Sequence, residues 1–176
     1  MKAVMNEGKI GPIILLLLLG FAGCGQNKFQ KEVDIEASGV KLVREVQRGK
    51  YNLITTVELK ELVKKKADIV LIDAMPYEDS YKKQHIPGAK NFLFPIMDDM
   101  PDWEAQKMEG KTKTQYEELL GPNKDALIVV YCGFVKCTRS HIGAAWAQKL
   151  GYTNVKRYAG GIYAWKGMGF YVQSAE

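Results

Sequence analysis

The stretch that most constrains the fold runs from residue 126 to residue 150, where an apolar segment ends at a cysteine and a helical pattern follows a short loop. Residues 126–131 are continuous, rich in β-branched side chains and bounded by Asp125 and Gly133. This pattern predicts a strand buried on both faces of a parallel sheet. Cys132 would then lie at the carboxyl end of the strand. Ligands bind at that edge in open α/β sheets, so Cys132 is a candidate functional residue.

The loop after Cys132 favours chemistry over simple packing. It consists of Gly133, Phe134, Val135, Lys136, Cys137, Thr138 and Arg139. We expect a helix to begin near Arg139 or Ser140 and to run to Leu150, with its amino end aimed at Cys132. Backbone N–H groups, the helix dipole and the cations Lys136 and Arg139 would lower the pKa of Cys132. The alternative is a small buried cysteine that only packs, although such a residue needs no basic loop.

Apolar segments and helical patterns alternate along the rest of the chain. Besides 126–131, strands are expected at 51–54, 68–73, 91–94 and 151–158. Helices are expected to begin at Thr55 and to cover 78–83, 101–108, 113–120, 140–150 and 160–166. This order predicts an α/β domain with a parallel sheet covered by helices on both faces. Asp73 ends the 68–73 strand at the same edge as Cys132, where it either holds the neighbouring loop or caps the turn toward Pro76.

Charge and histidine usage limit the function classes. The formal net charge is +5, and the only basic cluster, residues 64–66, ends a helical pattern. Cations suit that end of a helix, so a nucleic-acid site is not expected. His85 and His141 are the only histidines, and neither lies at ligand spacing from the cysteine pair. We therefore expect no metal and no cofactor.

The amino terminus resembles a bacterial lipoprotein signal over residues 1–23. Lys2 and Lys9 precede an apolar run at 13–19, and small residues precede Cys24. Lipidation of Cys24 would give an exported protein anchored to a membrane and facing the periplasm or the cell exterior. The residue after it is Gly25 rather than an aspartate, which favours an outer membrane. An ordinary secretory signal or an uncleaved anchor is the alternative, because Phe21 departs from the usual aliphatic residue.

Domain boundaries follow from these patterns. Residues 24–50 are polar with a weak apolar pattern, so we expect a tether and then a segment that packs on the edge of the domain, with no helix predicted. Residues 51–173 would form the domain itself. Cys132 and Cys137 are the only cysteines left if Cys24 is lipidated.

The chain resembles the rhodanese family of sulfurtransferases from about residue 51 to residue 171. The resemblance lies in the order and spacing of several short motifs, namely Leu71-Ile-Asp73, His85-Ile-Pro-Gly-Ala89, Val129-Val-Tyr-Cys132, Arg139-Ser140 with Ala144-Ala145, Leu150-Gly-Tyr-Thr-Asn-Val155, and Tyr158-Ala-Gly-Gly161 with Ala164-Trp165. It implies a rhodanese-like domain with a five-stranded parallel sheet. It also implies that Cys132 takes sulfane sulfur from thiosulfate or a similar donor and passes it, as a persulfide, to a thiophilic acceptor such as cyanide or a thiol. We expect a monomer.

Two features depart from the family pattern. The arginine usual two residues past the aspartate is missing, because Met75 stands at that position after Asp73. If Arg139 and Ser140 match the closing Arg-Ser of the family, the loop is two residues longer than usual. Arg139, and with it Lys136, would orient an anionic donor, while N–H groups curled around Cys132 would stabilise the persulfide.

Two other functions, and the role of Cys137 within a sulfurtransferase, stay open for this pattern. A phosphatase or arsenate reductase also uses a cysteine, an anion-binding loop and an arginine, but with five residues between them, whereas six separate Cys132 from Arg139. A non-catalytic sulfur or redox module would carry a disulfide between Cys132 and Cys137. Alternatively, Cys137 is a resolving thiol that attacks the persulfide, because a tight loop can bring it within disulfide distance.

Overall fold

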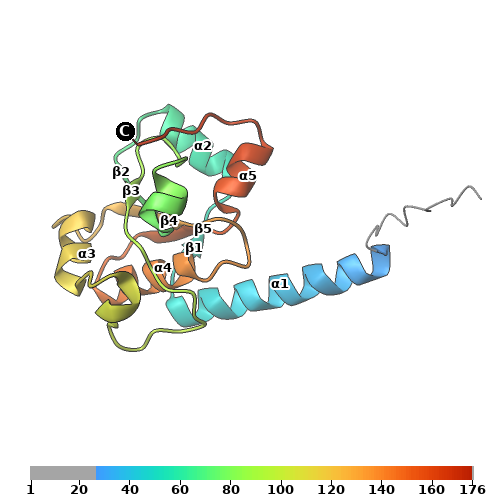
Figure 1. Cartoon of the computed structure of the whole chain (residues 1–176), viewed down its shortest axis with the longest axis horizontal. Helices are drawn as coiled ribbons and strands as arrows, with labels where there is room; N and C mark the ends of the chain where they lie inside the picture. The colour runs from blue at the N-terminus through green and yellow to red at the C-terminus, as the bar shows by residue number, and fades with distance from the viewer. Residues whose placement is uncertain (1–26, 176) are drawn as a thin grey trace, which may run out of the picture.

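The computed structural model describes residues 27–175 and shows a sheet covered by helices, with one long helix projecting from it (Figure 1). The signal expected at 1–23 and the proposed lipid site Cys24 lie outside the described residues. Among residues 27–175, no helix is both long enough and apolar enough to span a membrane.

Five parallel strands form one sheet in the order β1-β5-β4-β2-β3. The strands are β1 (Asn52–Leu53), β2 (Ile69–Asp73), β3 (Lys90–Asn91), β4 (Leu127–Tyr131) and β5 (Val155–Tyr158). The central strand β4 is flanked by β5 and β2, and its last four residues are buried, as a strand covered on both faces requires. The predicted five-stranded parallel sheet is confirmed. The third strand is shorter than predicted, since pairing at Lys90–Asn91 continues only as single hydrogen bonds from Phe92 and Phe94.

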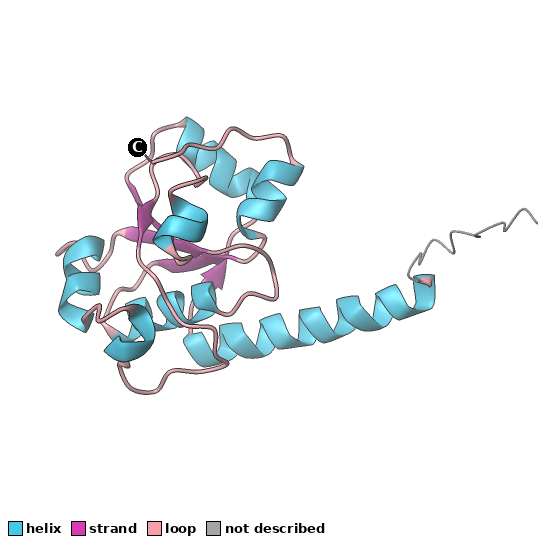
Figure 2. Ribbon diagram, in the orientation of Figure 1, coloured by secondary structure: helices cyan, strands magenta, loops and turns pink. Residues whose placement is uncertain are grey.

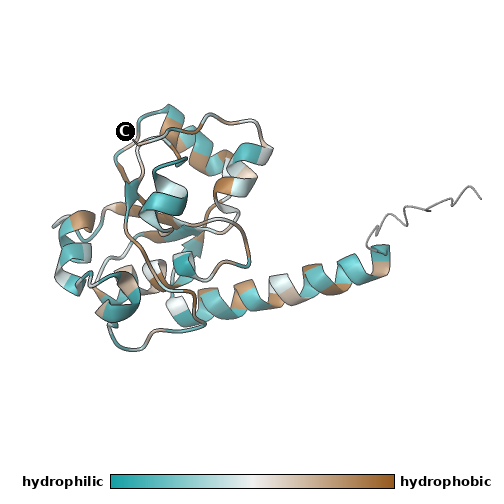
Figure 3. Cartoon of the chain, viewed as in Figure 1, coloured by the Kyte–Doolittle hydropathy of each residue, from teal (hydrophilic) through white to brown (hydrophobic). Residues whose placement is uncertain are grey.

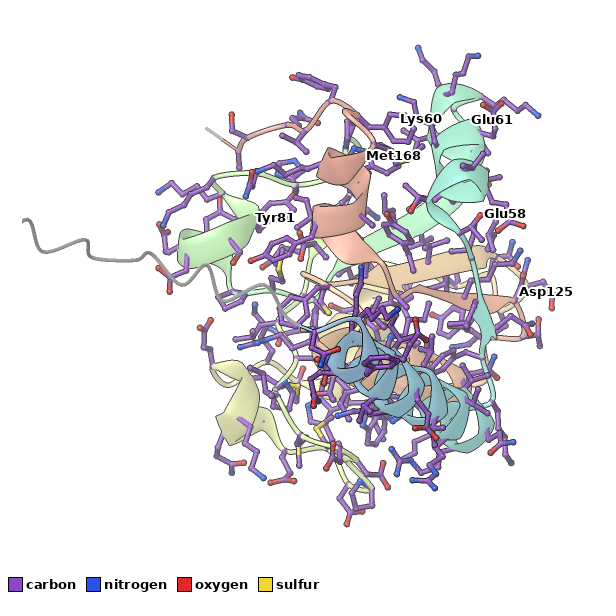
Figure 4. All side chains as sticks on the ribbon, turned by 90° about the vertical axis from the view of Figure 1, so that its right-hand side faces the viewer. Glu58, Lys60, Glu61, Tyr81, Asp125 and Met168 are labelled. Atoms are coloured by element: carbon purple, nitrogen blue, oxygen red, sulfur yellow. The ribbon has the colours of Figure 1, made fainter. Side chains whose placement is uncertain are left out.

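Helices cover both faces of the sheet (Figure 2). They are α1 (Lys28–Gly49), α2 (Thr56–Lys64), a π-helical turn η1 (Tyr77–Tyr81), a 3-10 turn η2 (Ala105–Met108), α3 (Lys113–Leu120), α4 (Arg139–Lys149) and α5 (Gly161–Gly167). Figure 4, which looks nearly along α1, shows α2 with Glu58 and Lys60 beside α5 with Met168, across the sheet from α1. The helix predicted at 101–108 is wrong over its first half. It is reduced to η2, and the chain turns away where Glu109 and Gly110 take positive φ angles.

The helix α1 was not predicted. It is a 22-residue helix. At its N-terminus the Asn27 side chain accepts a hydrogen bond from the Phe29 N–H, and it ends where Lys50 adopts a left-handed conformation. Its inner half packs against α4, with Glu45 and Gly49 buried, while its outer half projects beyond the domain (Figure 1). Figure 3 shows only narrow apolar bands along it. The domain covers only a small part of the helix. Its sequence therefore needs no continuous apolar stripe and does not show the usual pattern of a surface helix.

Candidate active site

Cys132 follows β4 directly, one residue beyond a level of the sheet shared by three strands. At that level Tyr131 pairs with Asp73 on β2 and with Tyr158 on β5. The cysteine is fully buried, with 0% of its surface exposed. Its thiol donates to the Cys137 carbonyl at 3.3 Å, and its sulfur lies 3.3 Å from Ser140 Oγ. The predicted place at the carboxyl edge of the sheet is therefore the one found.

The first residues of the loop are held by the start of α5. The carbonyls of Cys132 and Gly133 accept hydrogen bonds from the N–H groups of Ile162 and Tyr163 at 2.9 and 3.0 Å. Gly161 makes this approach possible. It has a φ of +60°, and a Cβ there would lie 2.2 Å from the Cys132 carbonyl oxygen, closer than any side chain tolerates. We call residues 132–133 the root of the loop.

The next residues form an exposed tip, which we define as Phe134, Val135 and Lys136. The Phe134 ring stacks on exposed Tyr163 with ring centroids 5.5 Å apart. An apolar groove separates the tip from α1, and Ile35 and Leu42 line its helical side. The chain then turns back, because the Cys137 N–H donates to the Phe134 carbonyl at 3.0 Å. The loop therefore folds back on itself, with its tip exposed to solvent and Cys132 buried beneath it.

The two cysteines of the loop share one environment and are free thiols. Burial raises the pKa of Cys132 well above its usual range, and a hydrogen bond with Cys137 adds to this. A side-chain hydrogen bond from the Cys132 thiol to the Cys137 sulfur lowers the pKa of Cys137, and the backbone N–H groups of Arg139 and Gly133 lower it further. The expected lowering of the Cys132 pKa is therefore not found, because burial outweighs the Ser140 hydroxyl and N–H groups that favour its thiolate. Cys137 lies nearer to solvent, and the Arg139 and Gly133 N–H groups favour negative charge on it.

Arg139 begins α4 and is partly buried. Within residues 27–175 its Nε atom is buried and makes no hydrogen bond. Lys136 is exposed at the tip. Thr138 is buried and its hydroxyl accepts from the Met97 N–H at 3.1 Å, so this side chain fixes the loop to the β3–η2 connection. The loop thus holds one cation close to the cysteines and one in solvent.

Asp73 ends β2 on the same edge, where its carboxyl interacts with the Tyr131 hydroxyl of β4. Its Oδ1 accepts from the Met75 N–H at 2.9 Å, so it caps the turn toward Pro76. Burial raises its pKa to about 6. His85 is buried and stacks on Tyr81, with centroids 4.1 Å apart, as a structural residue would.

A buried polar network, which was not predicted, lies behind the loop and is centred on Arg157 of β5. The guanidinium donates to Ser140 Oγ at 2.9 Å and to the Val135 and Cys137 carbonyls at 3.2 and 3.0 Å. It also pairs with Glu45 of α1. A charged residue inside a strand of otherwise buried side chains is the one signal that could have indicated this residue.

The network extends to two aromatic side chains. The Tyr51 hydroxyl lies 3.3 Å from Arg157 Nη1 and 2.9 Å from His141 Nδ1. Burial, followed by the positive charge of Arg157, lowers the pKa of His141 to about 4, so its ring is neutral at pH 7. A neutral His141 adds no cation to the site.

The fold and the site define a class of protein, a parallel α/β domain with a buried cysteine in the loop after its central strand. A family model described as the rhodanese-like domain matches residues 55–168, and the chain belongs to this family. It is 31% identical over 125 residues to a sulfur carrier protein, TtuD, from Thermus thermophilus, covering 68% of this chain. The chain spans only 40% of the length of that relative. Family and relative together support a function in sulfur transfer.

Solved structures share the fold. A thiosulfate sulfurtransferase from Pseudomonas aeruginosa superposes with a TM-score of 0.58 and 19% identity, over 81% of this chain and 24% of that one. A protein of unknown function from Rhodopseudomonas palustris, described as a possible tyrosine phosphatase, gives 0.52 and 22% identity, over 77% of this chain and 93% of that one. Identities this low establish the fold alone.

Proposed function

We propose that the protein is a sulfurtransferase that moves sulfane sulfur from thiosulfate, or a donor like it, to a thiophilic acceptor through a persulfide on Cys132. The observation that carries the proposal is the placement of Cys132 beneath a loop whose N–H groups converge on the sulfur pair. Converging N–H groups stabilise a sulfur anion as they stabilise other developing negative charge.

The chemistry balances with the residues present. The Cys132 proton passes to Cys137, the member of the pair that is otherwise the anion, and the Cys132 sulfur attacks the outer sulfur of thiosulfate. The sulfur–sulfur bond of the donor breaks and sulfite leaves with the electron pair. The acceptor, cyanide or a thiolate, then attacks the outer sulfur of the persulfide and returns Cys132 as a thiolate.

Arg139 is the donor-binding cation in this proposal. Its Nε atom is available for an anion, whereas the Arg157 guanidinium is committed to protein partners. Lys136 at the tip adds charge at the entrance. An anionic donor held this way would have its outer sulfur presented to Cys132 and its sulfite group facing the arginine.

The test is a transfer assay with thiosulfate and cyanide that reads thiocyanate, together with intact mass of the protein after donor alone. We expect thiocyanate formation and the mass gain of one sulfur atom, located on Cys132. An aryl phosphate is assayed in parallel. Phosphate release without either sulfur signal would overturn the proposal in favour of a phosphatase.

We also propose that the protein is an exported lipoprotein attached through Cys24, with an outer membrane favoured over other locations. The support is the sequence pattern of Lys2 and Lys9, the apolar run at 13–19 and the small residues before Cys24. Cys24→Ala should release the chain from membranes or leave it unprocessed. Membrane retention with normal processing in that variant would contradict the lipid anchor.

A further inference from the structure

Arg157 is placed where it can set the shape of the cysteine loop from behind. Its side chain is fully buried, with 0% exposed, and comes from β5 rather than from the loop. It binds the Val135 and Cys137 carbonyls through Nη2 and the Ser140 hydroxyl through Nε. The same hydroxyl contacts the Cys132 sulfur. One side chain therefore contacts the tip at Val135, the end of the loop at Cys137, and, through Ser140, the reactive cysteine.

These carbonyl contacts have a consequence for the other side of the loop. In a trans peptide the C=O and the following N–H point in opposite directions. Holding the Val135 carbonyl toward Arg157 turns the Lys136 N–H away from it. The Cys137 carbonyl is held between Arg157 and the Cys132 thiol, so it faces the sulfur. Arg157 thereby sets which backbone groups of the loop face the sulfur and which face an incoming donor.

Glu45 holds Arg157 in this position. Its side chain is buried, with 1% of the residue exposed, and its Oε2 accepts from Arg157 Nη1. Glu45 belongs to α1, 112 residues away in sequence and outside the 55–168 segment that matches the family. The contact is the charged link between α1 and the site. A buried ion pair is costly to desolvate, and losing one partner leaves the other charge uncompensated.

We infer that α1 is a working part of the sulfur-transfer site, in which Glu45 is a positioning residue that acts through Arg157 to hold the loop open to an anionic donor. The inference rests on the proposed function for its substrate and deepens it by assigning loop geometry to a helix outside the family domain. It follows that binding or displacement of α1 by another molecule would change donor use without touching either cysteine.

The test compares three variants of the full chain. Glu45→Gln removes the charge while keeping the shape of the side chain. Arg157→Lys keeps a charge but cannot reach Ser140 and both carbonyls at once. Glu32→Gln is the matched control, because Glu32 is an exposed carboxylate on the outer half of the same helix. Thermal unfolding of each variant is measured beside activity.

Two readouts separate positioning from simple stability. The first is the rate of persulfide formation against thiosulfate concentration. The second is the ratio of Cys132 alkylation rates with anionic iodoacetate and neutral iodoacetamide, located by peptide mass, which reports anion recognition without any sulfur chemistry. We expect Glu45→Gln to lower kcat/KM and the alkylation ratio about tenfold, and Arg157→Lys about 100-fold, as misplacement of a positioned group does. Glu32→Gln should change neither.

A folded Glu45→Gln protein with wild-type kcat/KM and wild-type alkylation ratio would overturn the inference. If that variant does not fold, the pair Glu45→Leu with Arg157→Met replaces it, since removing both charges is better tolerated than removing one. The folded double variant should still lose the alkylation preference for the anion, and retention of the preference would overturn the inference. Absence of sulfur transfer in the wild type, with the Glu45 effect on alkylation intact, would overturn only the proposed function.

Discussion

The ends of β2 and β4 lie at the same level of the sheet, yet they use their polar groups in opposite ways. At the end of β2, the Asp73 carboxylate accepts a hydrogen bond from the Met75 N–H. The Asn91 amide donates to the Asp73 and Met75 carbonyls at 3.1 and 2.7 Å. The polar groups of this turn bind one another. At the end of β4, N–H groups of the loop are directed at two sulfur atoms.

The difference shows that the carboxyl edge of a parallel sheet supplies a place for a site but not the site itself. In the cysteine loop, Arg157 and the start of α5 bind the carbonyls, and the Cys137 carbonyl also accepts from the Cys132 thiol. The N–H groups of Gly133, Arg139 and Ser140 favour negative charge on the two sulfurs.

The largest effect should come from Cys132→Ser, which breaks the β4 end alone. We expect sulfur transfer to fall below a few per cent of wild type, because a serine hydroxyl cannot form a persulfide. The substitution is small, so the free energy of unfolding should change by no more than about 1 kcal/mol. Thiocyanate formation and thermal unfolding measure the two quantities. Transfer well above that level would exclude Cys132 as the carrier.

Cys137→Ser should come next. If the Cys137 thiolate attacks the inner sulfur of the persulfide, the outer sulfur leaves as hydrosulfide with the bonding electron pair and a Cys132–Cys137 disulfide remains, so a thiol reductant is needed for each turnover. The variant should still form the persulfide but discharge it to thiols about tenfold more slowly, as loss of a positioned thiol implies. Intact mass of the wild type after discharge should show the loss of two hydrogen atoms. Normal turnover without a disulfide would leave Cys137 with no role in discharge.

Arg139→Ala should weaken donor binding at the β4 end without affecting the fold. We expect KM for thiosulfate to rise about tenfold, because the variant loses one charge-assisted hydrogen bond to the anion. Lys136→Ala is the comparison, and its effect should be smaller because Lys136 is exposed to solvent. Saturation curves for both variants measure this. An unchanged KM for Arg139→Ala would assign anion binding to the backbone and Lys136.

Asp73→Asn, at the β2 end, should have the smallest effect on transfer, within about twofold of wild type, because its carboxylate binds the Met75 N–H and lies outside the cysteine loop. Its effect on stability should depend on pH. The folded pKa is raised from 3.8 to about 6, so the folded state keeps a proton that the unfolded state has lost, and stability falls as pH rises through this range.

The asparagine variant has no such proton to lose. Relative to wild type it should gain about 3 kcal/mol between pH 3.5 and pH 7, the free energy of a two-unit shift. Urea unfolding of both proteins across this range measures the difference. A difference that is constant with pH would show that Asp73 ionises normally in the fold.

Local patterns were sufficient to predict much of this fold. The buried strands β2 and β4 are long apolar runs, and α2 begins with the capping box of Thr55 and Glu58 that the sequence contains. The place of Cys132 followed from the same rules. The helix at 101–108 was overpredicted because apolar residues there, such as Trp103 and Met108, contact the core from an irregular segment.

The rest depended on contacts between distant parts of the chain. Nothing near Glu45 in sequence shows that it is buried, because its partner lies on β5 and the pairing forms only when α1 packs beside α4. The pKa of Cys132 was likewise expected in the wrong direction. Helix and loop N–H groups were anticipated, but the complete burial of the sulfur and the competing sulfur of Cys137 were not.

The close contact between Gly161 and the root of the loop fixes the backbone on which Cys132 is carried. Backbone atoms fix the carbonyls of Cys132 and Gly133, and the absence of a Cβ at residue 161 leaves no slack between them. The position of the Cys132 backbone is therefore set by β4 and α5 and not by the remainder of the loop. A change in residues 134–139 would alter what reaches the sulfur without moving the backbone that carries it.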